Sequence, residues 1–117
     1  MKQKTQEGEN FPQTEAMIAL CTCPSRQVAE RLAHQLVEKR CAACVNIIPG
    51  VQSVYRWQGQ VAQDEEYLLV VKTTRKYFDS LSAQIADTHP YELPEVIGVS
   101  IEQGLSAYLR WIEEEVG

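Results

Sequence analysis

The residues best suited to chemistry in this chain are four cysteines, arranged as the pairs Cys21-x-Cys23 and Cys41-x-x-Cys44. Such pairs occur in structural zinc sites, in redox-active motifs and as reduced thiols of packed cores. Cys21 and Cys23 fall in an apolar segment, where the rise of a strand would hold their sulfurs about 6 to 7 Å apart, with no turn to converge them on zinc. Cys41 follows the expected end of a helix, the pole that does not favour a thiolate. We therefore expect Cys41 and Cys44 to be reduced core residues.

Cys21 and His89 need separate consideration. Cys21 lies near the C-terminal end of an expected strand, where ligand sites in sheets covered by helices tend to open, although a packed core thiol would also suit this position. His89 precedes Pro90 at an expected corner between a helix and a strand. A histidine at such a corner commonly hydrogen-bonds a backbone carbonyl and shapes the loop.

The residues that follow His89 have two interpretations, as parts of the corner or as the lining of a cleft. They are Tyr91, Glu92 and Glu95, joined in the cleft interpretation by Lys72 and by Trp57 of a neighbouring subunit. A mixture of aromatic, carboxylate and ammonium groups suits a small polar ligand. No helix places Glu92 and Glu95 together, so the sequence offers little support for a paired acid and base.

The first half of the chain predicts a strand, a helix and a long hairpin. An apolar run over 16–23 indicates a buried strand, and Ser25 is a candidate N-cap for the helix after it. That helix carries one apolar stripe, formed by Val28, Ala29, Leu32, Ala33, Leu36 and Val37. A strand then begins near Ala43 and continues past a kink at Pro49-Gly50, and Gln58-Gly59 makes a tight turn into a second arm that runs to Thr74.

The second half predicts a helix, a strand and a further helix. Thr73 or Thr74 is a candidate cap for a helix that turns Phe78, Leu81 and Ile85 inward and ends before His89-Pro90. A strand over 96–101 follows, and a last helix carries an apolar stripe of Leu105, Tyr108, Leu109, Ile112 and Val116. The predicted fold class is α+β: a ferredoxin-like βαββαβ sandwich with a long hairpin between its second and third strands and an extra C-terminal helix.

Length and composition indicate one domain over residues 16–117, preceded by a flexible N-terminal tail over residues 1–15 that has few apolar side chains. A core of this size needs no metal to fold. The net charge of −5 and the absence of a basic stripe argue against nucleic acid. The first apolar run is too short to span a membrane and does not resemble a secretory signal, so we expect a cytoplasmic protein.

The hairpin is longer than a monomer of this size needs, and it carries Tyr55 and Trp57 near its tip. Exposed aromatic residues on such a ribbon would favour aggregation unless another subunit covers them. The sequence therefore predicts a homo-oligomer.

Three groups of residues closely resemble the divalent-cation-tolerance (CutA) family: the segment 37–51, then Tyr55, Trp57 and Gly59, and finally the run 89–95. The resemblance extends from about Met17 to Ile112. It implies a homotrimer, and it implies that copper or another divalent cation is bound by Cys21 and His89. Thr88 stands where the family has the first of two histidines, so further ligands would come from Glu92, water or another subunit.

The resemblance implies a trimeric, cytoplasmic, metal-responsive binding protein that contributes to divalent-cation tolerance, copper in particular. The alternative is a trimeric signalling or scaffold protein similar to the PII proteins, which would bind a small ligand or a protein partner at clefts between subunits. The tight turn at Gln58-Gly59 disfavours a nucleotide sensor of that type. We expect no enzymatic activity and assign no catalytic residue, because the loop 22–26 lacks the glycine of a phosphate-binding loop and no other catalytic motif is present.

Overall fold

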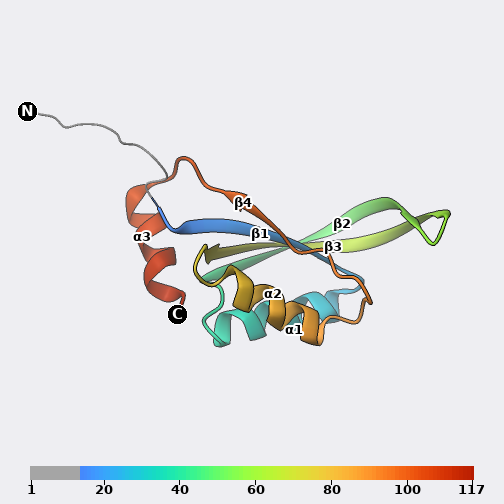
Figure 1. The fold of residues 1–117 in the computed structure, drawn as a ribbon, viewed down its shortest axis with the longest axis horizontal. Coiled ribbons are helices and arrows are strands. Elements are labelled where there is room, and N and C mark those ends of the chain that lie inside the picture. Colours follow the sequence, from blue (N-terminus) through green and yellow to red (C-terminus); the bar gives the residue numbers. More distant parts are fainter. Residues whose placement is uncertain (1–13) are drawn as a thin grey trace, which may run out of the picture.

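A computed structural model of the protein describes residues 14–117 (Figure 1). The predicted order of elements is confirmed. The elements are β1 (Ala16–Cys23), α1 (Arg26–Glu38), β2 (Cys44–Trp57), β3 (Gln60–Thr74), α2 (Phe78–Thr88), β4 (Ile97–Ser100) and α3 (Ser106–Glu115). None of these helices is long and apolar enough to cross a membrane.

The four strands form one antiparallel sheet in the order β2-β3-β1-β4. Helices α1 and α2 lie side by side on one face of this sheet, and α3 packs at the end opposite the hairpin (Figure 1). This is the ferredoxin-like arrangement that the sequence predicts, with the C-terminal helix added to it. The chain crosses from β1 through α1 to the edge strand β2.

The core fills the space between the sheet and the two helices that cover it. Alternate residues of β1 point into it, and they include Cys21 and Cys23. The stripe of α1 is buried as predicted at Ala29, Leu32, Ala33 and Leu36, and the Ser25 hydroxyl caps the helix by accepting a bond from the Val28 N–H at 3.2 Å. The prediction fails at Val37, which is 42% exposed because it lies at the edge of the stripe in the last turn.

The start of α2 differs from the prediction. Neither Thr73 nor Thr74 caps this helix, because its N-cap residue is Tyr77 and no side chain bonds to the first turn. Both threonines are still in β3, and the buried Thr73 hydroxyl instead donates to the carbonyl of Cys41 at 2.7 Å. The end of α2 is as predicted: it stops at Thr88, and His89 has extended backbone before Pro90.

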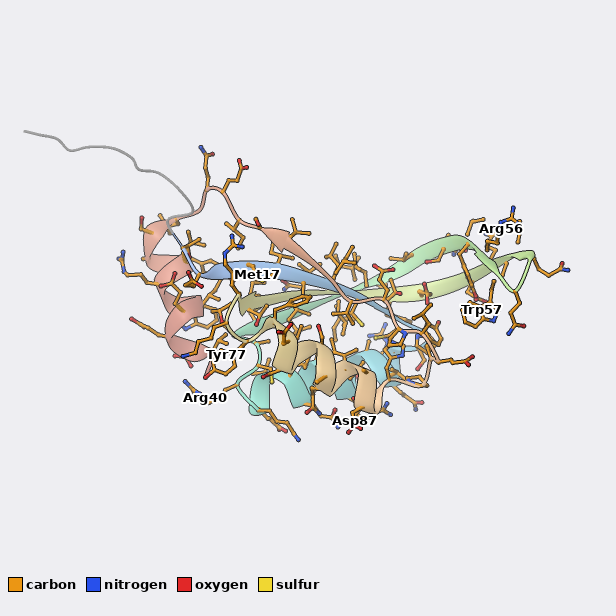
Figure 2. All side chains as sticks on the ribbon, in the orientation of Figure 1. Met17, Arg40, Arg56, Trp57, Tyr77 and Asp87 are labelled. Atoms are coloured by element: carbon orange, nitrogen blue, oxygen red, sulfur yellow. The ribbon has the colours of Figure 1, made fainter. Side chains whose placement is uncertain are left out.

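The hairpin of β2 and β3 projects far beyond the helices, and Arg56 and Trp57 lie near its free end (Figures 1 and 2). Its register shifts between Ile48 and Val51, where the sequence has Pro49-Gly50, so a bulge produces the predicted kink. The predicted turn is also confirmed, since Gln58 and Gly59 both have positive φ, as a two-residue hairpin turn requires.

The C-terminal helix closes the opposite end of the sheet. Ile112 and Val116 of this part of the chain are buried against Ala16 at the start of β1. Glu113 accepts bonds from the Thr14 hydroxyl at 2.6 Å and from the Glu15 N–H at 3.0 Å. The predicted N-terminal tail lies outside the described residues over 1–13, and its last two positions are held by these contacts.

Candidate functional site

The structure brings Cys21, Cys23 and His89 together at the C-terminal end of β1. One ligand atom from each residue, two sulfurs and an imidazole nitrogen, lies within 4.8 Å of the others. Among residues 14–117, no other group of three or more histidine, cysteine or acidic side chains converges closely enough to hold a metal ion. All three residues are buried.

The family resemblance implied that Cys21 and His89 lie together, and it did not include Cys23. Strand rise predicted that the two sulfurs would lie about 6 to 7 Å apart, whereas they approach within 4.8 Å. Side chains on a strand lean along the strand direction, and the extra bond from Cβ to Sγ lets two thiols on one face lean toward each other. The signal available in the sequence was the single residue between Cys21 and Cys23, which places both side chains on the same face of a strand.

His89 is fixed by hydrogen bonds at both ring nitrogens. Nε2 donates to the carbonyl oxygen of Thr22 at 2.8 Å, and Nδ1 accepts from the backbone N–H of Tyr91 at 3.1 Å. The ring also lies against that of Tyr91, with 4.8 Å between their centroids. The expectation that a histidine at this corner bonds a carbonyl and shapes the loop is therefore confirmed.

The two thiols of the cluster differ in their electrostatics. A hydrogen bond with Cys23, followed by burial, raises the pKa of Cys21 far above its ordinary value. The same bond lowers the pKa of Cys23, against the opposing effect of its burial. Of these two sulfurs, Cys23 therefore takes negative charge more readily than Cys21. The Cys21 thiol also lies 3.7 Å from the carbonyl oxygen of Thr22, to which it can donate.

This donor set fits a soft metal ion. Two thiols and an imidazole suit Cu(I), and the same group suits Zn(II) less well because no fourth histidine, cysteine or acidic side chain of residues 14–117 joins it. Coordination by His89 would use Nδ1, since Nε2–H is already committed to Thr22, and the N–H of Tyr91 would have to leave it. Glu92 is not part of the group, and its exposed side chain lies in a neighbouring cavity.

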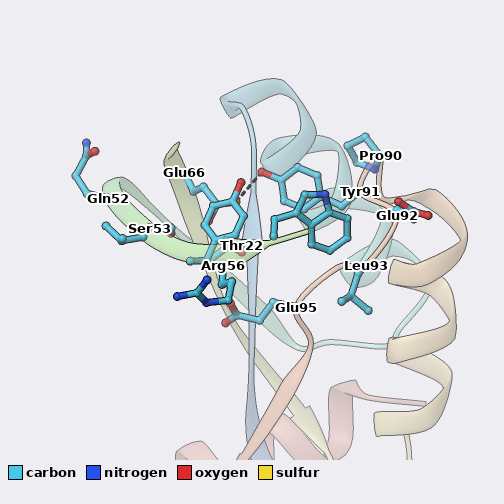
Figure 3. Close-up of a pocket in the computed structure, with 13 residues that line it drawn as sticks. Thr22, Gln52, Ser53, Arg56, Glu66, Pro90, Tyr91, Glu92, Leu93 and Glu95 are labelled. Atoms are coloured by element: carbon cyan, nitrogen blue, oxygen red, sulfur yellow. Dashed lines mark hydrogen bonds between the residues drawn. The ribbon is translucent and has the colours of Figure 1, made fainter. Parts of the chain in front are cut away.

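That cavity, of about 820 Å³, lies on the other side of β1, where the hairpin leaves the rest of the sheet. Figure 3 shows the side chains that line it. It contains Trp57, Tyr91, Glu92 and Glu95 from the predicted cleft, all from this one chain. Lys72 does not line it, and its ammonium instead lies beside the side-chain oxygen of Asn46 on the sheet.

Glu66 is the important residue of this cavity that sequence analysis did not identify. It is 6% exposed and accepts a hydrogen bond from the Tyr91 hydroxyl at 2.6 Å (Figure 3). Burial, and then the bond to Glu66, raises the pKa of Tyr91 well above its ordinary value. Glu66 is next to Glu65 in an acidic run, so no local pattern indicated that only one of these side chains turns inward.

The second cysteine pair does not form a site with the first. Cys41 is buried and joins the core, as expected, and burial raises its pKa. Cys44 is half-buried rather than buried, because β2 is an edge strand here, and the Lys72 ammonium lies 4.0 Å from its sulfur. All four cysteines are free thiols.

Known proteins are similar to this chain in sequence and in fold. Residues 17–115 match the family model described as CutA1 divalent ion tolerance protein. The divalent-cation tolerance protein CutA of Thermus thermophilus is 48% identical over 100 residues, which are 86% of this chain and 97% of that protein. Protein CutA of Mus musculus is 39% identical over 107 residues, 92% of this chain, and the matched part is 60% of the mouse protein's length.

Solved structures agree with the sequence matches. The structure of the divalent cation tolerance protein Cut A1 from Thermus thermophilus superposes with a TM-score of 0.85 at 47% identity, over 87% of this chain and 99% of that one. The chain therefore belongs to the CutA1 divalent ion tolerance family.

Proposed function

We propose that this protein is a metal-responsive binding protein that contributes to divalent-cation tolerance, and that copper is the cation it holds. The observation that carries the proposal is the convergence of Cys21, Cys23 and His89 within 4.8 Å at the end of β1. Membership of the CutA1 family supports the link to divalent-cation tolerance.

The chemistry of the three donors favours copper as Cu(I). Thiolates are soft ligands that suit this ion, and affinity for divalent first-row metals also runs highest for copper. Cys23 would supply the first thiolate, because the neighbouring Cys21 thiol lowers the pKa of Cys23. Cys21 and then His89 complete the set, so the proposed ligands are Cys21, Cys23 and His89, without Glu92.

A homotrimer is part of the proposal. The sheet face opposite α1 and α2 carries apolar side chains that the chain does not cover, among them Ile97 and Val99 of β4, which are 50% and 44% exposed. The hairpin adds exposed Val54, Tyr55, Trp57 and Val61. Apolar surface of this extent in a protein of this size indicates a subunit interface.

The cavity beside β1 supports a second candidate function, a trimeric signalling or scaffold protein similar to the PII proteins. Such a protein would bind a small ligand or a protein partner at its clefts. The hairpin ends in a two-residue turn, so a long loop for nucleotides is missing from the described tip. We expect either protein in the cytoplasm, where thiols stay reduced.

Competition titrations of reduced, metal-stripped protein with Cu(I), Cu(II) and Zn(II) would test the metal proposal. We expect about one Cu(I) per subunit, and we expect Cys21→Ser and Cys23→Ser each to weaken binding by about tenfold or more. Cys44→Ser is the matched control, because it removes a half-buried thiol outside the cluster. Equal losses for all three variants, or no saturable binding, would refute a site at this cluster.

Sedimentation at micromolar protein tests the assembly separately. A mass of three subunits that persists in the cysteine variants would support the trimer and show that the variants fold. A monomer would refute the trimer, whatever the outcome of the titrations.

A further inference from the structure

The two hydrogen bonds of the His89 ring determine which of its nitrogens carries the proton. A backbone N–H can only donate, so Nδ1 accepts from Tyr91 at 3.1 Å and holds no proton of its own. The proton of the neutral imidazole then lies on Nε2, which donates to the carbonyl oxygen of Thr22 at 2.8 Å. The lone pair that could coordinate a metal is therefore on Nδ1, and the N–H of Tyr91 occupies it.

A metal ion and Tyr91 compete for this lone pair. An imidazole nitrogen has one lone pair in the plane of the ring, which serves either a hydrogen bond or a metal ion. His89 can therefore join Cys21 and Cys23 as a ligand only after the N–H of Tyr91 has left Nδ1. Whatever holds Tyr91 in its place opposes the binding of the metal.

His89 itself is held too firmly to make this exchange by moving. Its backbone N–H donates to the Ile85 carbonyl at 2.8 Å, and its ring donates to Thr22. The Arg31 guanidinium also donates to the preceding carbonyl, that of Thr88, at 3.1 Å. His89 is buried in a packed environment that leaves its ring little space to reorient. The part of the chain that can move lies after this residue.

Tyr91 is the anchored residue of that following segment. The backbone N–H groups over 92–95 donate to no backbone carbonyl of residues 14–117. The Tyr91 hydroxyl, in contrast, donates to the buried carboxylate of Glu66 at 2.6 Å (Figure 3), and its ring lies against that of His89. Hydrogen bonds to carboxylates are among the stronger ones in proteins. The side chain of Tyr91 therefore keeps its N–H at Nδ1.

We propose that Tyr91 is a positioning residue that sets the affinity of the metal site, because its N–H competes with the metal for Nδ1 of His89 while Glu66 holds it in place. This inference rests on the proposed metal function. A contact that stabilises only the metal-free arrangement lowers metal affinity by the same free energy. Weakening the hold on Tyr91 should therefore tighten the site, whereas losing an ordinary supporting contact would loosen it.

Cu(I) competition titrations of Tyr91→Phe test the competition, with the oligomeric state monitored throughout. The variant keeps the ring and the backbone N–H but loses the bond to Glu66, and we expect it to bind Cu(I) about threefold or more tightly than the natural protein. Tyr77→Phe is the matched control, because Tyr77 lies at the opposite end of α2 from His89 and should leave affinity unchanged. Unchanged or weaker binding in Tyr91→Phe would overturn the proposal.

A second pair of variants tests the N–H itself. Tyr91→Pro and Tyr91→Ala both lack the ring and the hydroxyl, and Tyr91→Pro also lacks the N–H that occupies Nδ1. We expect tighter Cu(I) binding in Tyr91→Pro than in Tyr91→Ala, and equal or weaker binding would overturn the proposal. If Tyr91→Pro does not fold, Tyr91→Phe still decides the question.

Nitrogen NMR of the metal-free protein separates this proposal from the metal proposal. We expect the Nε2–H tautomer of His89, and the Nδ1–H tautomer would overturn the competition whatever the protein binds. Cu(I) binding that is lost in Cys23→Ser but indifferent to Tyr91→Phe would support the metal site and overturn the competition. Absence of Cu(I) binding in the natural protein and in every Tyr91 variant would overturn both.

Discussion

His89 Nε2 lies 2.8 Å from the carbonyl oxygen of Thr22, and this bond fastens the loop after α2 to the end of β1 across 67 positions of sequence. Strand β4 pairs with β1 only as far as Leu20, so the imidazole supplies a donor where the neighbouring strand has already left. The same loop carries Tyr91 into the cavity. One hydrogen bond therefore positions parts of both candidate sites.

Replacing His89 with alanine should destabilise the protein. The change leaves the Thr22 carbonyl and the Tyr91 N–H without their partners, and unpaired buried polar groups cost about 1 to 3 kcal/mol. Urea unfolding with and without the substitution measures the loss. His34→Ala is the control, because that histidine is exposed on α1. Similar unfolding midpoints for the two variants would contradict a structural role for His89.

The contrast between Leu36 and Val37 tests the corrected face of α1. Leu36 is fully buried in the core, so Leu36→Ala should cost about 2 to 5 kcal/mol through lost burial and the cavity it leaves. Val37 is 42% exposed in the same turn, and Val37→Ala should change stability by about 0.5 kcal/mol or less. Denaturant titrations of both variants measure the difference. A large loss in Val37→Ala would mean that another subunit covers this residue.

The sequence was sufficient for features decided by neighbouring residues. Ser25 caps α1 through a bond three residues along the chain, and Gln58-Gly59 turns the hairpin within two residues. Thr73 fits the same local pattern for a helix cap but does not cap α2. Strand β3 continues through Thr73, and its hydroxyl donates to the buried carbonyl of Cys41. Local patterns cannot weigh a distant partner of this kind.

The candidate sites depend on such distant partners. Cys21 and His89 were paired through the family resemblance, while the inward turn of Glu66 toward Tyr91 depends on how the loop crosses the end of β1. The sulfur of Cys23 joins the cluster because its side chain leans toward Cys21, which strand periodicity does not specify. The order of the elements and the hairpin turn at Gln58-Gly59 were predictable, and the side chains that meet across the elements were not.

Stability should depend on pH through Glu113. Bonds from the Thr14 hydroxyl and then the Glu15 N–H lower the pKa of this carboxyl below its ordinary value of 4.5. A lowered pKa in the folded state contributes stability that is fully present above the ordinary value and is lost as pH falls through the folded value. The difference in unfolding free energy between the natural protein and Glu113→Gln should therefore shrink as the pH is lowered from about 7 to about 3.

The control for this pH series is Glu114→Gln, which removes the neighbouring exposed carboxylate. Its difference from the natural protein should show no comparable dependence on pH. A difference for Glu113→Gln that stays constant or grows toward acid would contradict the assigned hydrogen bonds.

The turn of the hairpin offers a pair of substitutions with opposite expected effects. Gln58 has φ of 51°, a conformation that asparagine tolerates better than glutamine, so Gln58→Asn should stabilise the tip by a few tenths to about 1 kcal/mol. Gly59 has φ of 80°, and no atom lies within 4 Å of a Cβ placed on it. Gly59→Ala should therefore destabilise the tip by about 1 kcal/mol through its backbone alone.

Hydrogen exchange of the hairpin amides is the suitable measurement, because the tip lies far from the core and can open without global unfolding. Exchange near Val54 and Val61 should slow in Gln58→Asn and accelerate in Gly59→Ala. Equal exchange in both variants would indicate that contacts outside the turn hold the tip closed, as packing of hairpins between subunits would do. The same two variants then become a probe of the assembly, since dilution of a dissociating oligomer would restore the predicted difference between them.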